Sequence, residues 1–231
     1  MKLIDFSDFI IFLKNPSLEK QFDIKSLSSF LKLVWKSFLI LLAGDIILGL
    51  LFCGPLIYFN LFPSLKGINF SLFNILKISL FYPIIEELIF RLPLRSSKFN
   101  LVISFSILIS LLVFKRLISN VYLAISLSLI LYFSLSLFLR EDSLFLIKLI
   151  NFFTLRFRVV FYFQALLFGF LHLTNYNIEF KYFYLFPLFI MNYIFTGCFW
   201  GYLRVRYANG IYLCIASHIV VNSIYCLILS H

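Results

Sequence analysis

The chain has 231 residues, of which 62% are hydrophobic and only 13% are charged, and its mean hydropathy is +1.02. Soluble domains carry about 25% charged residues, so this composition argues against a soluble domain and predicts a polytopic helical membrane protein. The short alternating segments of a transmembrane β-barrel are absent from the sequence. The net charge of +10 comes from basic residues that lie between apolar runs, which indicates contact with the lipid bilayer rather than with nucleic acid.

The N-terminal third begins with a mixed segment and continues into a long apolar run. Residues 1–33 combine apolar and charged side chains, and they are predicted to form an amphipathic segment on the cytoplasmic face. Asp5 and Asp8 interrupt its apolar patch, which is not typical of a cleavable signal peptide. Residues 34–69 are predicted to hold the first transmembrane span, at about 34–60, and the loop that follows it.

Apolar runs of similar length continue to the C-terminus. The elements expected there are a span at 70–92, two helices within 99–139 that turn near Lys115 and Arg116, an amphipathic connector at 140–157, and spans at 158–175, 182–203 and 208–229. The total is seven spans, or eight if the N-terminal segment inserts. With the N-terminus in the cytoplasm, most basic residues fall on the inner side. The pattern therefore predicts a multi-pass protein of the cell membrane with a cytoplasmic N-terminus.

Several small residues are expected to serve packing alone. Gly197 and Gly201 form a small-xxx-small face on which another helix can pack closely. The cysteines lack a CxxC spacing, lie in apolar runs and are predicted to be buried small hydrophobic residues. They are Cys53, Cys198, Cys214 and Cys226.

The stretch "FYPIIEELIFR" at 81–91 places three charged side chains within an apolar run. Ionisable groups at membrane depth are costly and are therefore candidates for function. On a helix, Glu87 and Arg91 are separated by four residues and can pair, whereas Glu86 points about 100° away and has no local partner. Pro83 tends to kink the helix just before them. The alternative is that both acids only neutralise arginines and hold the bundle together.

Two histidines lie in later spans, each with a partner four residues away. In "FGFLH", Phe168 and His172 share a helical face, although a single histidine there can also be a packing residue. In "SHIVVNS", His218 and Asn222 can converge on one atom, either a metal or a polarised water. Two imidazoles, an amide and a spare carboxylate suffice to activate a water for hydrolysis. The third histidine, His231, is C-terminal and is given no role.

Taken in order, the motifs EExxxR, FxxxH and HxxxN resemble those of the CPBP family of intramembrane proteases. This family includes the CAAX prenyl endopeptidases and the bacteriocin-processing, Abi-like proteins. The three motifs occupy 86–91, 168–172 and 218–222, and the resemblance covers about 70–228. Residues 70–231 are accordingly expected to form a protease domain of this type.

The resemblance also implies roles for individual residues. Glu86 would be the water-activating carboxylate and His172 its partner, while His218 and Asn222 would complete the catalytic site by binding a metal or by stabilising the oxyanion. If a divalent metal such as zinc is used, the possible ligands are His172, His218 and Asn222. The supporting residues would be Glu87, Arg91 and Phe168.

The function expected from these motifs is endopeptidase cleavage of a peptide or membrane-protein substrate within the bilayer. Two alternatives stay open, a non-catalytic immunity or scaffolding protein of the same family and a small-solute transporter. The expected spans also contain a conflict, because Glu86 lies about five residues from the inner end of its span and His172 lies near the outer end of its own. A shared site needs similar depths, so either a predicted boundary is wrong, or the 158–175 helix is tilted or begins within the membrane.

Overall fold

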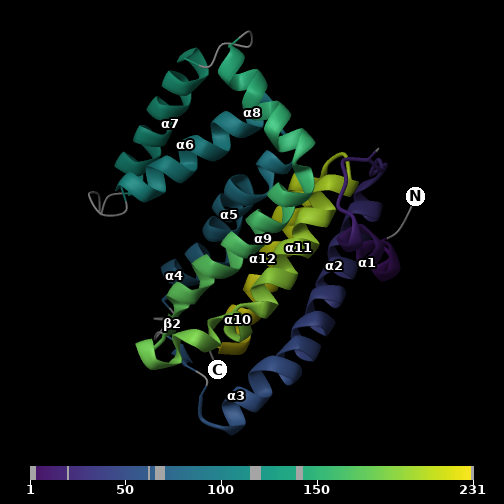
Figure 1. Cartoon of the computed structure of the whole chain (residues 1–231), viewed down its shortest axis with the longest axis vertical. Helices are drawn as coiled ribbons and strands as arrows, with labels where there is room; N and C mark the ends of the chain where they lie inside the picture. The colour runs from purple at the N-terminus through teal and green to yellow at the C-terminus, as the bar shows by residue number, and fades with distance from the viewer. Residues whose placement is uncertain are drawn as a thin grey trace.

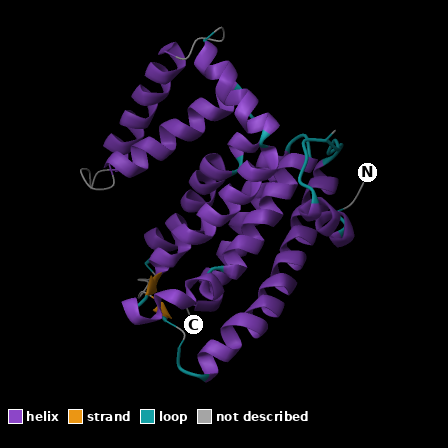
Figure 2. Ribbon diagram, in the orientation of Figure 1, coloured by secondary structure: helices purple, strands orange, loops and turns teal. Residues whose placement is uncertain are grey.

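Helices account for almost the whole of the computed structural model, which describes residues 4–19, 21–61, 63–65, 71–114, 121–138 and 143–229 (Figure 2). The turn expected at Lys115 and Arg116, and the C-terminal His231, lie outside the described residues. The all-α fold class predicted from the composition is thus confirmed.

The elements follow one another along the chain as α-helices interrupted by short π and 3-10 turns. In chain order they are α1 (Phe6–Lys14), α2 (Leu27–Leu48), the π turn η1 (Gly49–Cys53), α3 (Gly54–Tyr58), β1 (Ser64–Leu65), α4 (Leu72–Leu76), the π turn η2 (Lys77–Phe81), α5 (Tyr82–Phe90), the 3-10 turn η3 (Leu92–Leu94), α6 (Lys98–Phe114), α7 (Val121–Phe138), α8 (Leu144–Leu155), α9 (Phe157–His172), the 3-10 turn η4 (Leu173–Asn175), β2 (Tyr176–Asn177), the 3-10 turn η5 (Phe180–Leu185), α10 (Phe186–Phe189), α11 (Met191–Arg206) and α12 (Gly210–Leu229). The two short strands pair antiparallel, with Ser64 opposite Asn177.

Within the described residues, four helical stretches are long and apolar enough to cross a membrane. They are Leu27–Tyr58, Phe157–Asn175, Lys181–Arg206 and Gly210–Ile228. The helical stretch from α4 to α5 is not among them, and it carries Lys77, Glu86 and Glu87. The structure therefore supports a helical membrane protein, whereas the expected count of seven to eight spans is not confirmed.

The helices α5, α9, α11 and α12 run side by side in a bundle, with α2 along one edge (Figure 1). Two glycines of α11 allow α9 to approach closely. A Cβ added to Gly197 would lie 3.1 Å from Cα of Ala165, and one added to Gly201 would lie 2.7 Å from the ring of Phe161. The packing role predicted for this pair of glycines is therefore confirmed.

The N-terminal segment packs against the bundle through its apolar side chains. Phe9 and Phe12 of α1 are fully buried, and both rings meet Tyr202 of α11 edge-on. The first long helix also begins earlier than position 34, because Ser26 caps the N-terminus of α2 and accepts a hydrogen bond from the backbone N–H of Ser29. The apolar residues of 1–33 thus contribute to the core of the bundle.

The conflict in depth between Glu86 and His172 is resolved by the place where α5 ends. The chain continues beyond α5 as the turn η3, whose three residues are all buried, so α5 stops inside the bundle. The rings of Phe90 and Phe168 are in contact, with centroids 5.7 Å apart. One helical turn from this contact, Glu86 and His172 lie at the same level. The structure thus brings the two side chains to one level, and the boundaries of the 70–92 span in the membrane stay a prediction.

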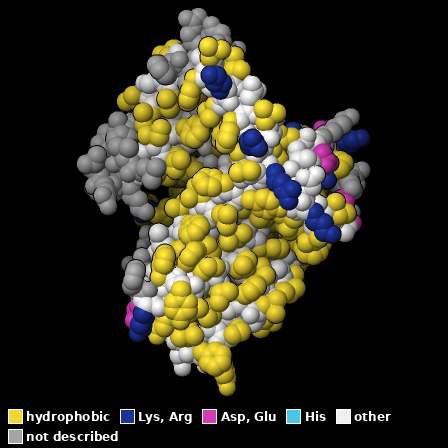
Figure 3. Space-filling model, in the orientation of Figure 1, with side chains coloured by type: hydrophobic (Ala, Val, Ile, Leu, Met, Phe, Trp, Pro, Cys, Tyr) yellow, Lys and Arg dark blue, Asp and Glu magenta, His cyan; other side chains and the backbone are white. Residues whose placement is uncertain are grey.

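The helices α6, α7 and α8 form a separate corner of the molecule (Figure 1). Here α6 packs on both α7 and α5, and Ser104 of α6 donates to the backbone oxygen of Ile89, while α8 leads back to α9. Hydrophobic side chains cover most of the visible surface, whereas Lys and Arg gather mainly at the end where the N-terminal segment lies (Figure 3). A surface of this kind suits a lipid environment.

Candidate active site

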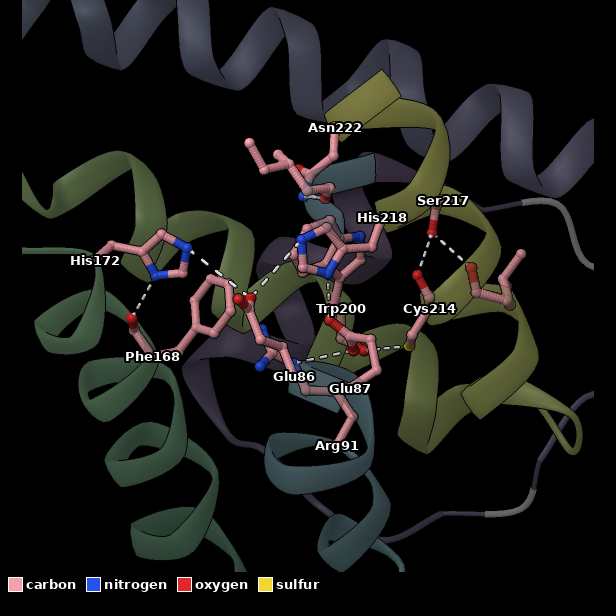
Figure 4. A network of polar contacts seen from close by, with 12 residues as sticks. Glu86, Glu87, Arg91, Phe168, His172, Trp200, Cys214, Ser217, His218 and Asn222 are labelled. Atoms are coloured by element: carbon pink, nitrogen blue, oxygen red, sulfur yellow. Dashed lines mark hydrogen bonds and ion pairs between the residues drawn. The ribbon is translucent and has the colours of Figure 1, made fainter. Parts of the chain in front are cut away.

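Three of the side chains singled out from the sequence meet between α5, α9 and α12 (Figure 4). Oε2 of Glu86 lies 4.0 Å from Nε2 of His172 and 3.9 Å from Nε2 of His218. Their helices come from separate parts of the chain, so only the fold brings these atoms together. The structure thus places Glu86, His172 and His218 in one cluster.

The hydrogen bonds of the two imidazoles define which ring nitrogen faces Glu86. Nδ1 of His172 lies 2.8 Å from the backbone oxygen of Phe168, and Nδ1 of His218 lies 2.9 Å from Oε1 of Glu87. A carbonyl oxygen and a carboxylate can only accept, so both Nδ1 atoms carry the hydrogen and donate it. In the neutral rings each Nε2 is then an acceptor, and both lone pairs are directed toward Glu86.

Glu86 therefore faces two other acceptors. Its Oε2 is buried and has no hydrogen-bond partner among the described residues. A water between these atoms can donate one hydrogen to Glu86 and the other to one of the imidazoles, and water is the donor that a polar buried site normally recruits. The side chain of Glu86 is 29% exposed and that of His172 is 17% exposed, against 3% for His218. A water or a substrate can thus reach the cluster from the side of Glu86 and His172.

Glu87 takes no part in this group of acceptors, because it is fully buried and points about 100° away from Glu86, toward Arg91 and Nδ1 of His218. Its Oε2 lies 3.5 Å from Nε of Arg91, which confirms the i,i+4 pair expected from the sequence. Its Oε1 accepts the hydrogen bond from His218. Glu87 therefore holds the imidazole of His218 in orientation while it compensates the buried charge of Arg91.

Phe168 links several of these groups. Its ring lies 4.4 Å, centroid to centroid, from the imidazole of His172, and its backbone oxygen accepts from the same residue. The guanidinium carbon of Arg91 lies 4.2 Å from the centre of the Phe168 ring, within the range of a cation–π interaction. Phe168 thus fixes the position of His172 and covers the charge of Arg91.

Asn222 lies one turn beyond His218 on α12, but it makes a different contact from the one expected. Its Nδ2 donates to the backbone oxygen of Ile78 at 3.0 Å, in the π turn η2. Because that oxygen can only accept, the side-chain nitrogen must face it. One N–H of the amide is therefore committed to the helix that carries Glu86, and one remains.

Two aromatic residues of α11 were missed in the sequence. The ring of Trp200 stacks on His218 at 3.9 Å between centroids, and that of Tyr193 stacks on His172 at 4.2 Å. Neither belongs to a polar motif. The position of Trp200 between two packing glycines was the available signal, since those glycines bring α11 close to its neighbours.

The distances from Glu86 to the two imidazoles can be compared with those of a zinc site and of a shared water. In the described residues, no group of three or more His, Cys, Asp or Glu side chains could hold a metal ion. Two ligands about 2.1 Å from a tetrahedral zinc ion would lie about 3.4 Å apart, which is less than the separations of 3.9 and 4.0 Å found here. Two hydrogen bonds of about 2.8 Å to one water, nearly at right angles, span about 4 Å. Asn222, the third possible ligand, would coordinate through Oδ1, which its hydrogen bond from Nδ2 to Ile78 leaves available.

The cysteines play no part in this cluster. All four are free, and three of them are buried, as predicted for small hydrophobic residues. Cys214 donates its thiol hydrogen to the backbone oxygen of Trp200 at 3.0 Å. Its role is therefore to join α12 to α11 behind the histidine.

Comparison with known protein families agrees with the motifs. The model of the Type II CAAX prenyl endopeptidase Rce1-like family matches residues 68–224, which is more than half of the chain and includes all three motifs. Searches of curated proteins and of solved structures returned no match. The resemblance to the CPBP proteases drawn from the motifs is confirmed, and the chain belongs to the Rce1-like family of type II CAAX prenyl endopeptidases.

Proposed function

We propose that this chain is an intramembrane endopeptidase that hydrolyses a peptide bond with a water held among Glu86, His172 and His218. The observation that carries the proposal is the buried Oε2 of Glu86, which has no hydrogen-bond partner in the described residues and faces two acceptor nitrogens. Membership of a protease family supports the same reaction class. A purely structural acid would be paired, as Glu87 is.

In the proposed reaction, Glu86 accepts a proton from the water while His172 accepts the second hydrogen as a hydrogen bond and orients the oxygen. The oxygen attacks the carbonyl carbon of the peptide, and the carbonyl oxygen becomes an oxyanion. The tetrahedral intermediate then collapses, the C–N bond breaks, and the proton held by Glu86 passes to the leaving amine. General-base assistance of this kind contributes about 10²–10⁴-fold to the rate.

The oxyanion would be stabilised from α12. The second N–H of Asn222 would donate to it, while the neutral His218, whose Nδ1 donates to Glu87, keeps Nε2 as an acceptor that faces the water. Oxyanion donors contribute about 10²–10³-fold each, so this side of the site matters as much as the base. No step of this scheme requires a metal.

The protein is further proposed to be a multi-pass protein of the cell membrane with its N-terminus in the cytoplasm. The helical stretch from α4 to α5 and the α6–α7 hairpin would then also lie within the bilayer and bring the count to seven. Basic side chains support this orientation, because they gather where the N-terminal segment meets the ends of α5 and α11 (Figure 3). Arg95, for example, donates to the backbone oxygens of Glu19 and Val205 in this region.

The test is cleavage by the purified protein in detergent. Two probes are used, a fluorogenic peptide with a farnesylated CAAX end and the same peptide without the lipid. The proposed chemistry can cleave either probe, because it acts on the peptide bond. Glu86→Gln and His172→Ala should each lower the rate by about 10²-fold or more. Glu179→Gln, the same change at an exposed acid that pairs with Lys181 and has no hydrogen bond or ion pair to the cluster in the described residues, is the matched control and should cleave like wild type.

If Glu86→Gln and His172→Ala both cleaved like wild type, the catalytic assignment would be wrong. A different outcome would favour the immunity or scaffolding alternative: no cleavage by wild type, together with a cellular phenotype that Glu86→Gln leaves intact.

A further inference from the structure

The π turn η2 leaves a backbone carbonyl without its regular helical donors, eight residues before Glu86. In an α-helix the oxygen of Ile78 would accept from the N–H of Tyr82, but that N–H donates to the oxygen of Lys77. In a π turn the donor would be the N–H of residue 83. Residue 83 is proline and has none. Both donors that a regular helix offers to Ile78 are therefore missing.

Asn222 provides the replacement. Its Nδ2 donates to the oxygen of Ile78 at 3.0 Å, from a helix that is distant in the sequence. The hydrogen bond is part-buried, and a carbonyl that lacks a donor in such a place costs free energy unless another group satisfies it. The amide of Asn222 therefore substitutes for the N–H that Pro83 lacks, and it allows the open turn to persist.

This contact bears on the position of Glu86. Two residues of α12 one turn apart hold the helical stretch that carries it, since His218 binds Glu87 just after it and Asn222 binds Ile78 before it. A π turn contains one extra residue relative to an α-helix, so closing it would rotate Glu86 by about 100° relative to the part of the helix that precedes the turn. Such a rotation would take Oε2 of Glu86 away from the two imidazoles.

We propose that Asn222 is a positioning residue for Glu86, in addition to any contact it makes with the substrate, and that Pro83 and Asn222 act as a pair. Pro83 leaves the carbonyl oxygen of Ile78 without a donor from its own helix, and Asn222 of α12 donates a hydrogen bond to it. The inference rests on the proposed function of Glu86, but the pairing itself is a property of the fold and can be measured without a substrate.

The test is a double-mutant cycle of wild type, Asn222→Ala, Pro83→Ala and the double variant. In the Pro83→Ala background, the new N–H of residue 83 can donate to Ile78, so the loss of Asn222 should matter less. We expect Asn222→Ala to lower kcat at least tenfold more in wild type than in the Pro83→Ala background, with KM nearly unchanged. The part of the kcat loss that Asn222→Ala still causes in the Pro83→Ala background measures the direct contact of Asn222 with the substrate. An equal fold-loss in both backgrounds would overturn the inference.

Hydrogen–deuterium exchange of the peptides that span 77–86 provides a second measurement that needs no catalysis. These amides should exchange faster in Asn222→Ala, and the double variant should return them toward wild-type protection. Equal exchange in wild type and Asn222→Ala would contradict the pairing, even if the protein proved to be no protease. If wild type itself cleaved no peptide while the exchange pattern was as expected, the result would count against the proposed function alone. If Asn222→Ala does not fold, recovery of folded protein by adding Pro83→Ala becomes the test, and failure of the double variant to fold refutes the pairing.

Discussion

The adjacent acids Glu86 and Glu87 allow one chemical change to be compared in two environments. Glu87 is fully buried beside Arg91, whose side chain is only 2% exposed, and it also accepts from His218. Oε2 of Glu86 has no hydrogen-bond partner in the described residues, and no arginine or lysine ion pair to Glu86 is found among them. Its neighbours are the imidazoles of His172 and His218 at 4.0 and 3.9 Å. We expect Glu87→Gln to destabilise the protein strongly and Glu86→Gln to leave its stability nearly unchanged.

The magnitude follows from the geometry of the ion pair. At 3.5 Å, with an effective dielectric constant of about 20, the attraction between Glu87 and Arg91 is about 5 kcal/mol. Removing one partner of a buried pair leaves the other charge uncompensated and costs about 3–5 kcal/mol. Glu86→Gln removes a buried charge that has no partner, so its effect on the free energy of unfolding should stay within about 1 kcal/mol.

Thermal unfolding of the purified variants in one detergent measures the difference. Glu87→Gln should lower Tm by on the order of 10 °C, while Glu86→Gln should melt within a few degrees of wild type. The double variant Glu87→Gln with Arg91→Met should recover part of the loss, because the unpaired cation is then gone. The reasoning is refuted if Glu87→Gln melts like wild type, or if adding Arg91→Met makes it less stable still.

Three other changes test the packing and the chemistry around the site. Trp200→Ala removes the ring stacked on His218 and should cost about 3–5 kcal/mol in a detergent melt, with Trp200→Phe losing less. Gly210→Ala would place a Cβ 2.5 Å from the backbone oxygen of Leu203 and should destabilise the protein by about 1–3 kcal/mol. As a control, the Cβ of Gly54→Ala would lie 3.7 Å from its nearest atom, so the Tm of that variant should equal or exceed that of wild type. Dialysis against a chelator should leave peptide cleavage unchanged, and loss of activity that zinc restores would contradict the water-only scheme.

Local helical geometry made part of the site predictable. Because residues four apart share a helical face, the pair of Glu87 and Arg91 could be named in advance, and the same spacing left Glu86 without a local partner. The family could also be predicted, because each motif is a short local pattern that can be read directly from the sequence, and the family model confirms it.

Contacts between distant segments could not be read in this way. The hydrogen bond from His218 to Glu87 joins residues 131 positions apart, and no local spacing indicates it. The stacking of Trp200 on His218 depends equally on how α11 packs. The buried 3-10 turn Leu92–Leu94 after α5 was not predicted, because hydropathy does not distinguish such a turn from the end of a membrane span.

The adjacent positions of the two acids explain why a bundle this apolar can hold a reactive carboxylate. Successive residues on a helix point about 100° apart, so Glu86 and Glu87 face different neighbours from the same turn. Glu87 is bound by Arg91 and His218 and anchors α5 to α12. That anchor is one residue away from Glu86, and it limits how far the unpaired carboxylate can move to find a partner of its own. The stability supplied at Glu87 therefore allows Glu86 to remain unpaired beside the two imidazoles, which is the state that a water-activating base requires.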